Sequence, residues 1–381
     1  MPTVSYIKNF SHTIIAAVFS LFIGQSHVAQ AFPQFSGDGY FSCTSCHVST
    51  SGGDALTAYG RSFAEEKLTT WSFEGEGKAL HGSMNIPEWL LVGGHVRMIQ
   101  VHYEDSKISQ GNFFVMQREV DLGYAGDALK FYVTVANERD EAGEYDTKTV
   151  TMPKWVVRYD ILEKFSVRAG KTPPKFGLNI ADHNAYIRRN IGLGTEADEK
   201  LIEASYFSET IEVNISQSAA FLPAVKEPNE VDPGTYANTY ANLSYFFLEK
   251  QRVSTSFLRR KKVESLEQIG SVSLALTPAE KVRALFEYNA GEREVSDVKT
   301  KLQNSFSQVI FESFKGVFPN ITYHYQTGKS GAEESRGDKI AAGLAWHPRP
   351  HFEFSGSFGS VRNLKTYTYG HSGFLMFHYW L

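Results

Sequence analysis

The stretch Leu129-Lys130-Phe131-Tyr132-Val133-Thr134-Val135 decides the fold, because four large apolar side chains alternate with Lys130, Tyr132 and Thr134. Successive side chains of a β-strand point to opposite faces, so this period of two predicts a strand with one apolar face. The pattern recurs to the C-terminus, with clear cases at 112–124, 280–290, 350–361 and 371–381. We therefore expect an all-β chain.

About sixteen such segments can be laid end to end between turn signals. They are 90–103, 112–124, 128–138, 150–161, 163–171, 199–208, 210–219, 235–248, 251–260, 266–276, 280–290, 302–313, 317–327, 338–347, 350–361 and 371–381. Long polar connections are expected at 139–149, 172–198, 220–234, 291–301 and 328–337. These tend to alternate with tight connections at 125–127, 277–279 and 347–349.

An even number of strands and alternating long and short connections are typical of a transmembrane antiparallel β-barrel of the bacterial outer membrane. A soluble β-sandwich has no reason to keep that alternation, although it remains the alternative fold. Composition fits either, with a net charge of −4, 14% aromatic residues and a mean hydropathy of −0.28. With both termini periplasmic, the 172–198 connection lies on the cell exterior or folds into the lumen. Its Pro173-Pro174, His183, Arg188 and Arg189 are compatible with an infolded constriction loop or with a solvated surface.

Residues 1–31 have the pattern of a secretory signal peptide: Lys8 in a basic n-region, an apolar run over 14–24, and the small-x-small site Ala29-Gln30-Ala31. The apolar run is shorter than the roughly twenty residues of a spanning helix. We expect cleavage before Phe32 and a location in a bacterial envelope.

Cys43-Thr44-Ser45-Cys46-His47 is a C-x-x-C-H motif, in which two thiols can form thioethers to haem vinyl groups while the histidine ligates the iron. Cys43 and Cys46 are the only cysteines of the chain, so a single haem c is expected, with His47 as an axial ligand of its iron. A thioredoxin-like redox pair is the competing interpretation, but it requires a βαβ setting that the Gly/Ser-rich surroundings do not provide.

Residues 32–88 are too few for a complete cytochrome core, and a plug inside the barrel formed by residues 89–381 is the simplest interpretation. The interior of a barrel of this size is wide enough to be plugged. A second axial ligand is expected if the haem is a fast electron carrier. The candidates are His81, Met84, His95, Met98 and His102.

The chain resembles the fused monohaem cytochrome-porin family of the outer membrane, found in iron oxidisers. That family combines a signal peptide, one C-x-x-C-H motif, a Leu-Thr-x-Phe-Gly-Arg-x-Phe stretch and a barrel. The matching residues are Cys43, Cys46, His47, Leu56, Thr57, Gly60, Arg61 and Phe63, with departures at Tyr59, where the family has Phe, and Ala64, where it has Lys. The specific match spans about thirty residues, and the barrel matches in architecture alone.

The resemblance implies electron transfer across the outer membrane between an extracellular donor, with Fe(II) as the candidate, and a periplasmic c-type cytochrome. The alternative is a solute-diffusion porin in which the haem segment gates or senses. A third possibility is a soluble periplasmic cytochrome. No constellation typical of hydrolytic or nucleotide chemistry stands out, and no nucleic-acid partner is expected for an exported barrel.

Overall fold

The computed structural model describes residues 43–44, 46–52, 55–139, 145–180, 182, 184–194, 198–218, 237–248, 250–262, 265–331 and 333–381. The predicted signal peptide and the mature N-terminus at Phe32 lie outside these ranges, as does His183. None of the helices in the described part of the chain has the length and apolarity needed to cross a bilayer.

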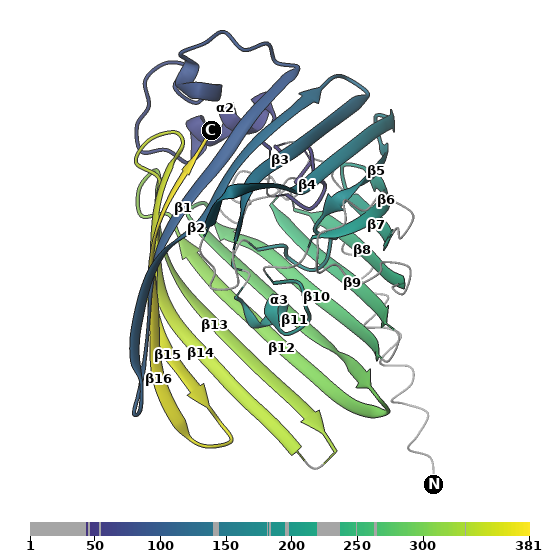
Figure 1. Cartoon of the computed structure of the whole chain (residues 1–381), viewed down its shortest axis with the longest axis vertical. Coiled ribbons are helices and arrows are strands. Elements are labelled where there is room, and N and C mark those ends of the chain that lie inside the picture. Colours follow the sequence, from purple (N-terminus) through teal and green to yellow (C-terminus); the bar gives the residue numbers. More distant parts are fainter. Residues whose placement is uncertain are drawn as a thin grey trace.

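Sixteen antiparallel strands close into a barrel in which each strand pairs with its sequence neighbours and β1 pairs with β16 (Figure 1). The strands are β1 (Leu90–Asp105), β2 (Ser109–Ala125), β3 (Leu129–Arg139), β4 (Tyr145–Leu162), β5 (Phe165–Thr172), β6 (Glu199–Phe207), β7 (Ile211–Ser218), β8 (Ala237–Phe247), β9 (Gln251–Lys262), β10 (Ser265–Ala279), β11 (Val282–Val295), β12 (Val298–Phe311), β13 (Val317–Ser330), β14 (Glu333–Trp346), β15 (Phe352–Asn363) and β16 (Thr368–Trp380). The predicted fold class, a closed antiparallel barrel of about sixteen strands, is confirmed.

Three of the predicted long connections are largely strand. The expected loop at 139–149 is shortened because β4 begins at Tyr145. The expected loop at 291–301 is a tight turn at Ser296 and Asp297, whose positive φ angles of 47° and 66° suit a two-residue hairpin. The expected loop at 328–337 is likewise mostly strand, because β13 extends to Ser330 and β14 begins at Glu333. The strand ends at 291–301 and 328–337 are mostly polar, apart from Val295 and Val298, so they lack the alternation by which a strand is recognised in sequence.

The predicted alternation separates the two faces of the wall. Val120, Leu122 and Phe131 lie on the outer face, with 49, 47 and 42% of each residue exposed. Asn242 and Ser254 belong to the inner face and are buried. A closed wall leaves no unpaired sheet edge between its first and last strands, and an apolar outer face suits contact with lipid.

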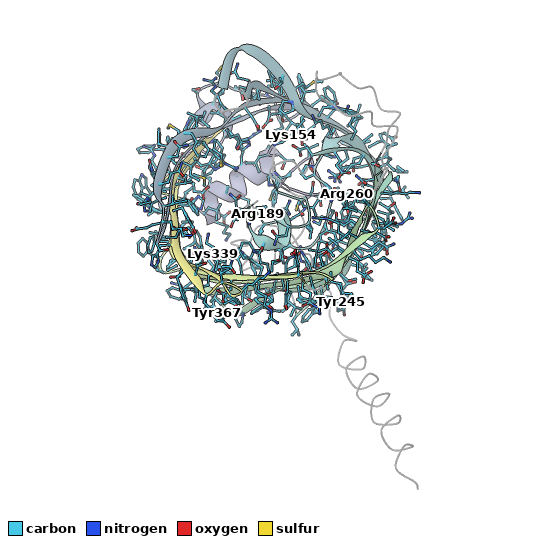
Figure 2. All side chains as sticks on the ribbon, turned by 60° about the horizontal axis from the view of Figure 1, so that its bottom comes forward. Lys154, Arg189, Tyr245, Arg260, Lys339 and Tyr367 are labelled. Atoms are coloured by element: carbon cyan, nitrogen blue, oxygen red, sulfur yellow. The ribbon has the colours of Figure 1, made fainter. Side chains whose placement is uncertain are left out.

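Two segments fill the inside of the wall (Figure 2). The first contains α2 (Ala58–Lys67) and η2 (Ala79–Gly82) and precedes β1. The second is the connection between β5 and β6, which carries α3 (Tyr186–Arg189) and folds into the lumen. Its infolding is fixed by bonds to the wall: Asn289 Nδ2 donates to Ile187 O at 2.8 Å, and Arg293 Nη2 donates to Asn190 O at 3.0 Å. Of the two predicted positions for this loop, the structure has the one inside the lumen.

The two infolded segments pack on each other and on the wall. Phe63, Ala64 and Leu68 of the α2 region share one buried cluster with Ile187 and with Phe318 of the wall. The connections from each even-numbered strand to the next odd-numbered strand lie at the end of the barrel where β1 begins and β16 ends, which we call the terminal rim. α2 lies toward this rim, near the C-terminus (Figure 1).

Candidate haem-attachment site

The C-x-x-C-H motif forms a single tight turn. The amide of His47 donates to Cys43 O at 2.9 Å, and the amide of Cys46 donates to the same oxygen at 3.3 Å. The turn brings the backbones of Cys43, Cys46 and His47 together at one carbonyl oxygen. All three residues are buried, and both cysteines are free thiols.

The family-like stretch 56–63 holds this turn in place. Thr57 is the N-cap of α2: its Oγ1 accepts from the Gly60 amide at 3.1 Å, while its own amide donates to Cys46 O at 2.9 Å. Gly60 brings the helix backbone directly against Cys46, where any side chain would overlap the carbonyl. Arg61 Nη1 donates to Val92 O of β1 at 3.1 Å, which ties the helix to the wall.

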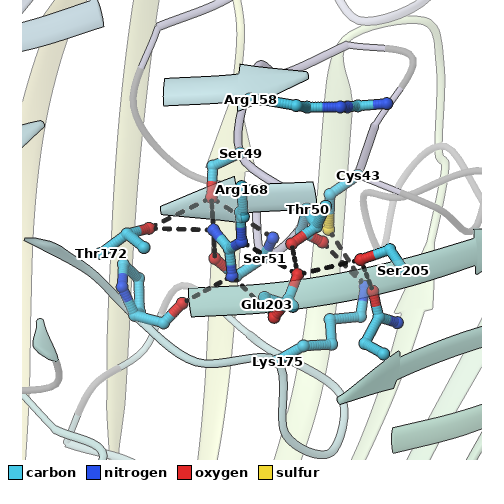
Figure 3. A network of polar contacts seen from close by, with 12 residues as sticks. Cys43, Ser49, Thr50, Ser51, Arg158, Arg168, Thr172, Lys175, Glu203 and Ser205 are labelled. Atoms are coloured by element: carbon cyan, nitrogen blue, oxygen red, sulfur yellow. Dashed lines mark hydrogen bonds and ion pairs between the residues drawn. The ribbon is translucent and has the colours of Figure 1, made fainter. Parts of the chain in front are cut away.

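The residues that follow the motif, Ser49-Thr50-Ser51, are bound to the wall through a buried ion pair (Figure 3). Arg168 on β5 lies opposite Glu203 on β6, with Nε to Oε1 at 2.9 Å and Nη2 to Oε2 at 3.0 Å. Arg168 Nη1 also donates to Ser49 Oγ at 2.7 Å, and Thr50 Oγ1 donates to Glu203. A buried ion pair requires additional hydrogen bonds to offset the loss of hydration, and the loop supplies them.

Lys175 joins the motif to the infolded β5–β6 connection. Its Nζ lies 3.5 Å from Cys43 Sγ, 3.2 Å from Thr50 O and 3.4 Å from Glu212 Oε1 (Figure 3). Burial alone lowers the pKa of Lys175, but Cys43 and Glu212 beside it raise that pKa above its ordinary value. The ammonium therefore stays charged inside the lumen, where it holds the cysteine end of the motif.

Burial controls the state of the second thiol. Desolvation, with a smaller contribution from Cys43, raises the pKa of Cys46 to about 12. At neutral pH this sulfur is a protonated thiol, neither a thiolate ligand for a metal ion nor a reactive redox thiol. The described residues contain no group of three or more His, Cys, Asp or Glu side chains arranged to hold a metal ion.

The residues present fit a covalently attached haem. Two free thiols and one imidazole lie in a single buried turn, which is held by a hydrogen bond from Thr57 to Cys46 and by the contact of Lys175 with Cys43. When bound, the haem would be held by Cys43 and Cys46 through thioethers and by His47 through its iron, and it would supply one-electron redox chemistry.

The structure separates the candidates for a second axial ligand. Met84 is 62% exposed, and His102 lies beside Glu104 with 44% of its side chain exposed. His81 lies on the terminal rim and is hydrogen-bonded to Tyr379 at 2.8 Å. Met98 is three residues from His95 on β1 and therefore faces the opposite side of the strand. His95, with 13% of its side chain exposed, lies on the lumen face of β1.

Sequence reasoning missed the charged anchors Arg168, Lys175 and Glu203. Arg168 and Glu203 are far apart in sequence and become a pair only through the register of β5 and β6. Lys175 follows the Pro173-Pro174 pair singled out in the sequence, but its position beside Cys43 depends on the loop folding inward.

Comparison with known proteins supports the barrel fold alone. No family model matches the chain, and no curated protein matches it. Among solved structures the chain is similar to a loop L8 deletion mutant of OmpT, an outer membrane protein of Vibrio cholerae, with a TM-score of 0.62 and 10% identity over 77% of this chain and 99% of that one.

Two further similar structures are outer-membrane channels. The outer membrane channel DcaP of Acinetobacter baumannii gives a TM-score of 0.54 with 9% identity, covering 77% of this chain and 97% of that one. The anion-selective porin from Comamonas acidovorans gives 0.54 with 10% identity, covering 77% and 99%.

The fold is thus that of a porin-like outer-membrane β-barrel. The closed wall, its apolar outer face and this likeness together place the chain in a bacterial outer membrane, in contact with lipid, as predicted. The porin half of the family resemblance is confirmed at the level of fold. The cytochrome half, the haem and the domain boundaries stay predictions.

Proposed function

We propose that this protein transfers single electrons across the outer membrane through one c-type haem held inside its barrel. The observation that carries the proposal is the position of the C-x-x-C-H turn, which is buried within a closed wall. Arg168 of the wall binds Ser49 just after the turn, and Lys175 of the infolded β5–β6 connection contacts Cys43. Fe(II) at the cell surface is the candidate donor, and a periplasmic c-type cytochrome is the candidate acceptor.

The chain's own residues would serve this function by keeping lipid away from the haem and by holding the loop around it in one position. The wall keeps lipid away from the site, since every backbone polar group of a closed barrel is paired within the protein. The buried ion pair of Arg168 and Glu203 fixes the loop after His47. Rigid, buried side chains around the haem would rearrange little when the charge of the iron changes. The same side chains would also influence its reduction potential.

A second candidate is a solute porin in which the segment before β1 gates or senses. The observation that favours it is the likeness to structures described as a channel and as an anion-selective porin. Against it, α2 and the β5–β6 connection occupy the lumen together and share one buried cluster.

The test uses the full chain expressed with haem-maturation machinery. Pyridine haemochrome absorbance should show one covalent haem per chain, and Cys46→Ala should impair its attachment. The purified protein is then placed in liposomes that enclose a redox dye, and Fe(II) is added outside. Reduction of the dye by the wild-type protein, with little reduction by Cys46→Ala, supports the conduit.

Planar-bilayer conductance on the same preparation separates the two functions. A barrel with little ion current that reduces the enclosed dye is a conduit. A barrel with a large, steady ion current and no dye reduction is a porin, and that result would refute electron transfer.

A further inference from the structure

His95 belongs to a buried chain of hydrogen-bonding side chains on the lumen face of three neighbouring strands. Its Nδ1 lies 3.1 Å from Nε2 of His378 on β16, and the two rings are stacked with centroids 5.3 Å apart. Nδ1 of His378 lies 3.1 Å from Oε2 of Glu353 on β15. In the register Glu353 lies directly opposite His378, whereas His95 pairs with Trp380 and meets His378 on the diagonal, two residues along β16.

The carboxylate at one end of this chain sets the tautomer of both rings. An ionised carboxylate only accepts hydrogen bonds, so His378 Nδ1 must carry the proton that Glu353 accepts. Nε2 of a neutral His378 is then a lone pair, and it accepts a proton from His95 Nδ1. Neutral His95 therefore presents its remaining nitrogen, Nε2, as a lone pair, which is the form that binds iron.

The segment that carries the haem motif lies against this part of β1. Val48 packs in a buried cluster with Leu91, and Arg61 donates to the carbonyl of Val92. Leu91 lies four residues from His95 on β1, so the two side chains share the lumen face of that strand. Nε2 of His95 is 3.7 Å from the Asp121 carboxylate, which is an ion-pair contact when the ring is protonated but is longer than a hydrogen bond when the ring is neutral.

We propose that His95, through Nε2, is the second axial ligand of the haem iron, and that His378 and Glu353 position it. This inference rests on the proposed function, because it requires a haem on Cys43 and Cys46. Metal-bound histidines commonly donate their other ring N–H to a carboxylate or a similar partner, which fixes the ring and raises its basicity. The hydrogen bonds from His95 to His378 and from His378 to Glu353 match this pattern, with the His378 imidazole placed between the ligand and the carboxylate.

The main competitor is His347, in the turn between β14 and β15. It is buried, and neither ring nitrogen has a hydrogen-bond partner in the described part of the chain. Its ring packs edge-on against Phe318 and Trp380, at 5.9 and 6.0 Å. Unlike His95, His347 has no partner that would select a tautomer. A His347 variant is therefore compared with the His95 variant in the tests below.

The first test needs no mutation. Near-infrared magnetic circular dichroism of the oxidised, haem-loaded wild-type protein should show the charge-transfer band of an iron with two nitrogenous axial ligands. A band typical of His/Met ligation would overturn the inference and point to a methionine. Absence of covalent haem would instead refute the proposed function, so the two failures are distinguishable.

The second test compares haem-loaded variants by electron paramagnetic resonance. His95→Gly should convert the ferric haem from low spin to high spin, and added imidazole should restore the low-spin signal. His371→Ala, at an exposed position on β16, should leave the signal unchanged. The inference is wrong if His95→Gly stays low spin while His347→Ala becomes high spin.

Two further variants test the arrangement itself. His95→Met should remain low spin, gain the His/Met charge-transfer band and raise the reduction potential, which shows ligand exchange even if the glycine variant folds poorly. Glu353→Gln should stay low spin with a raised potential, because a neutral amide supports the imidazole pair less well. A Glu353→Gln variant with an unchanged potential would contradict the positioning role.

Discussion

Gly60 lies so close to Cys46 that a methyl group on its Cα would overlap the Cys46 carbonyl oxygen. Both residues belong to the short stretch that resembles cytochrome-porins, and this contact gives a physical reason for glycine at that position. The first turn of α2 and the haem motif are in backbone contact, and a larger residue would separate them.

Gly60→Ala is therefore expected to loosen the motif. Alanine favours helix over glycine by about 1 kcal/mol, so propensity alone predicts stabilisation. Overpacking a tight contact costs about 1–3 kcal/mol, and here the obstacle is backbone, so destabilisation should win. Hydrogen exchange at residues 46–61, followed by mass spectrometry, should accelerate by roughly tenfold.

The matched control is Gly270→Ala on β10, where the nearest atom to the new methyl group is 3.9 Å away. We expect its effect to be within about 0.5 kcal/mol, as for most uncrowded sites. Slower exchange in Gly60→Ala would mean that helix propensity outweighs the contact.

The ion pair of Arg168 and Glu203 should behave as one unit. Either Arg168→Met or Glu203→Gln leaves its partner buried without its main charge partner, which typically costs about 3–5 kcal/mol. The double variant removes both charges and should cost clearly less than the sum. Urea unfolding in detergent micelles, analysed as a double-mutant cycle, measures the coupling. Additive effects would show that the two side chains do not stabilise each other.

The thiol of Cys46 should resist alkylation in the folded, haem-free chain. Its pKa is raised to about 12, so at pH 8 the thiolate is rarer than in an ordinary cysteine by about a hundredfold or more. Iodoacetamide labelling, read at the peptide level, should be correspondingly slow and should recover in urea. Rapid labelling at pH 8 in the folded state would show that the thiol is accessible.

The same shift makes the haem-free plug sensitive to alkali. The folded state holds the Cys46 proton more tightly than the unfolded state, so between the ordinary thiol pKa near 9 and about 12 stability falls as pH rises. Hydrogen exchange of residues 46–61, corrected for the intrinsic rate, should therefore increase over this interval. Cys46→Ser, whose hydroxyl does not titrate there, should lose the dependence.

Adjacent residues on β12 offer a direct test of which face meets lipid. Val309 is 45% exposed on the outer face, and Gln308 points inward, where it bonds to Asn320 and Thr322. An arginine facing lipid costs about 2–4 kcal/mol at the bilayer midplane and about 0–1 kcal/mol near the interfaces, and Val309, two residues from the end of β12, falls in the lower part of this range. Val309→Arg should thus unfold at lower urea in liposomes, whereas Gln308→Arg should change stability by less than about half as much. Equal effects would contradict the assignment of faces.

The sequence alone determined the wall of this protein. Alternation such as that of Leu129–Val135 reflects lipid on one side and a polar interior on the other, so each strand carries its own signature. The parts of β11 and β12 between Gly291 and Lys301 are polar apart from Val295 and Val298, so their sequence predicted a loop where the structure has strand.

The C-x-x-C-H motif was likewise readable, because Cys43, Cys46 and His47 lie within five consecutive residues. What surrounds the motif was decided only by tertiary structure. The pairing of Arg168 with Glu203 depends on strand register. The contact of Lys175 with Cys43 depends on a loop that folds inward. The alignment of His95, His378 and Glu353 depends on closure of the barrel, which joins the first strand to the last. Each of these contacts links residues that are far apart in the chain, and local sequence patterns do not predict which distant residues meet.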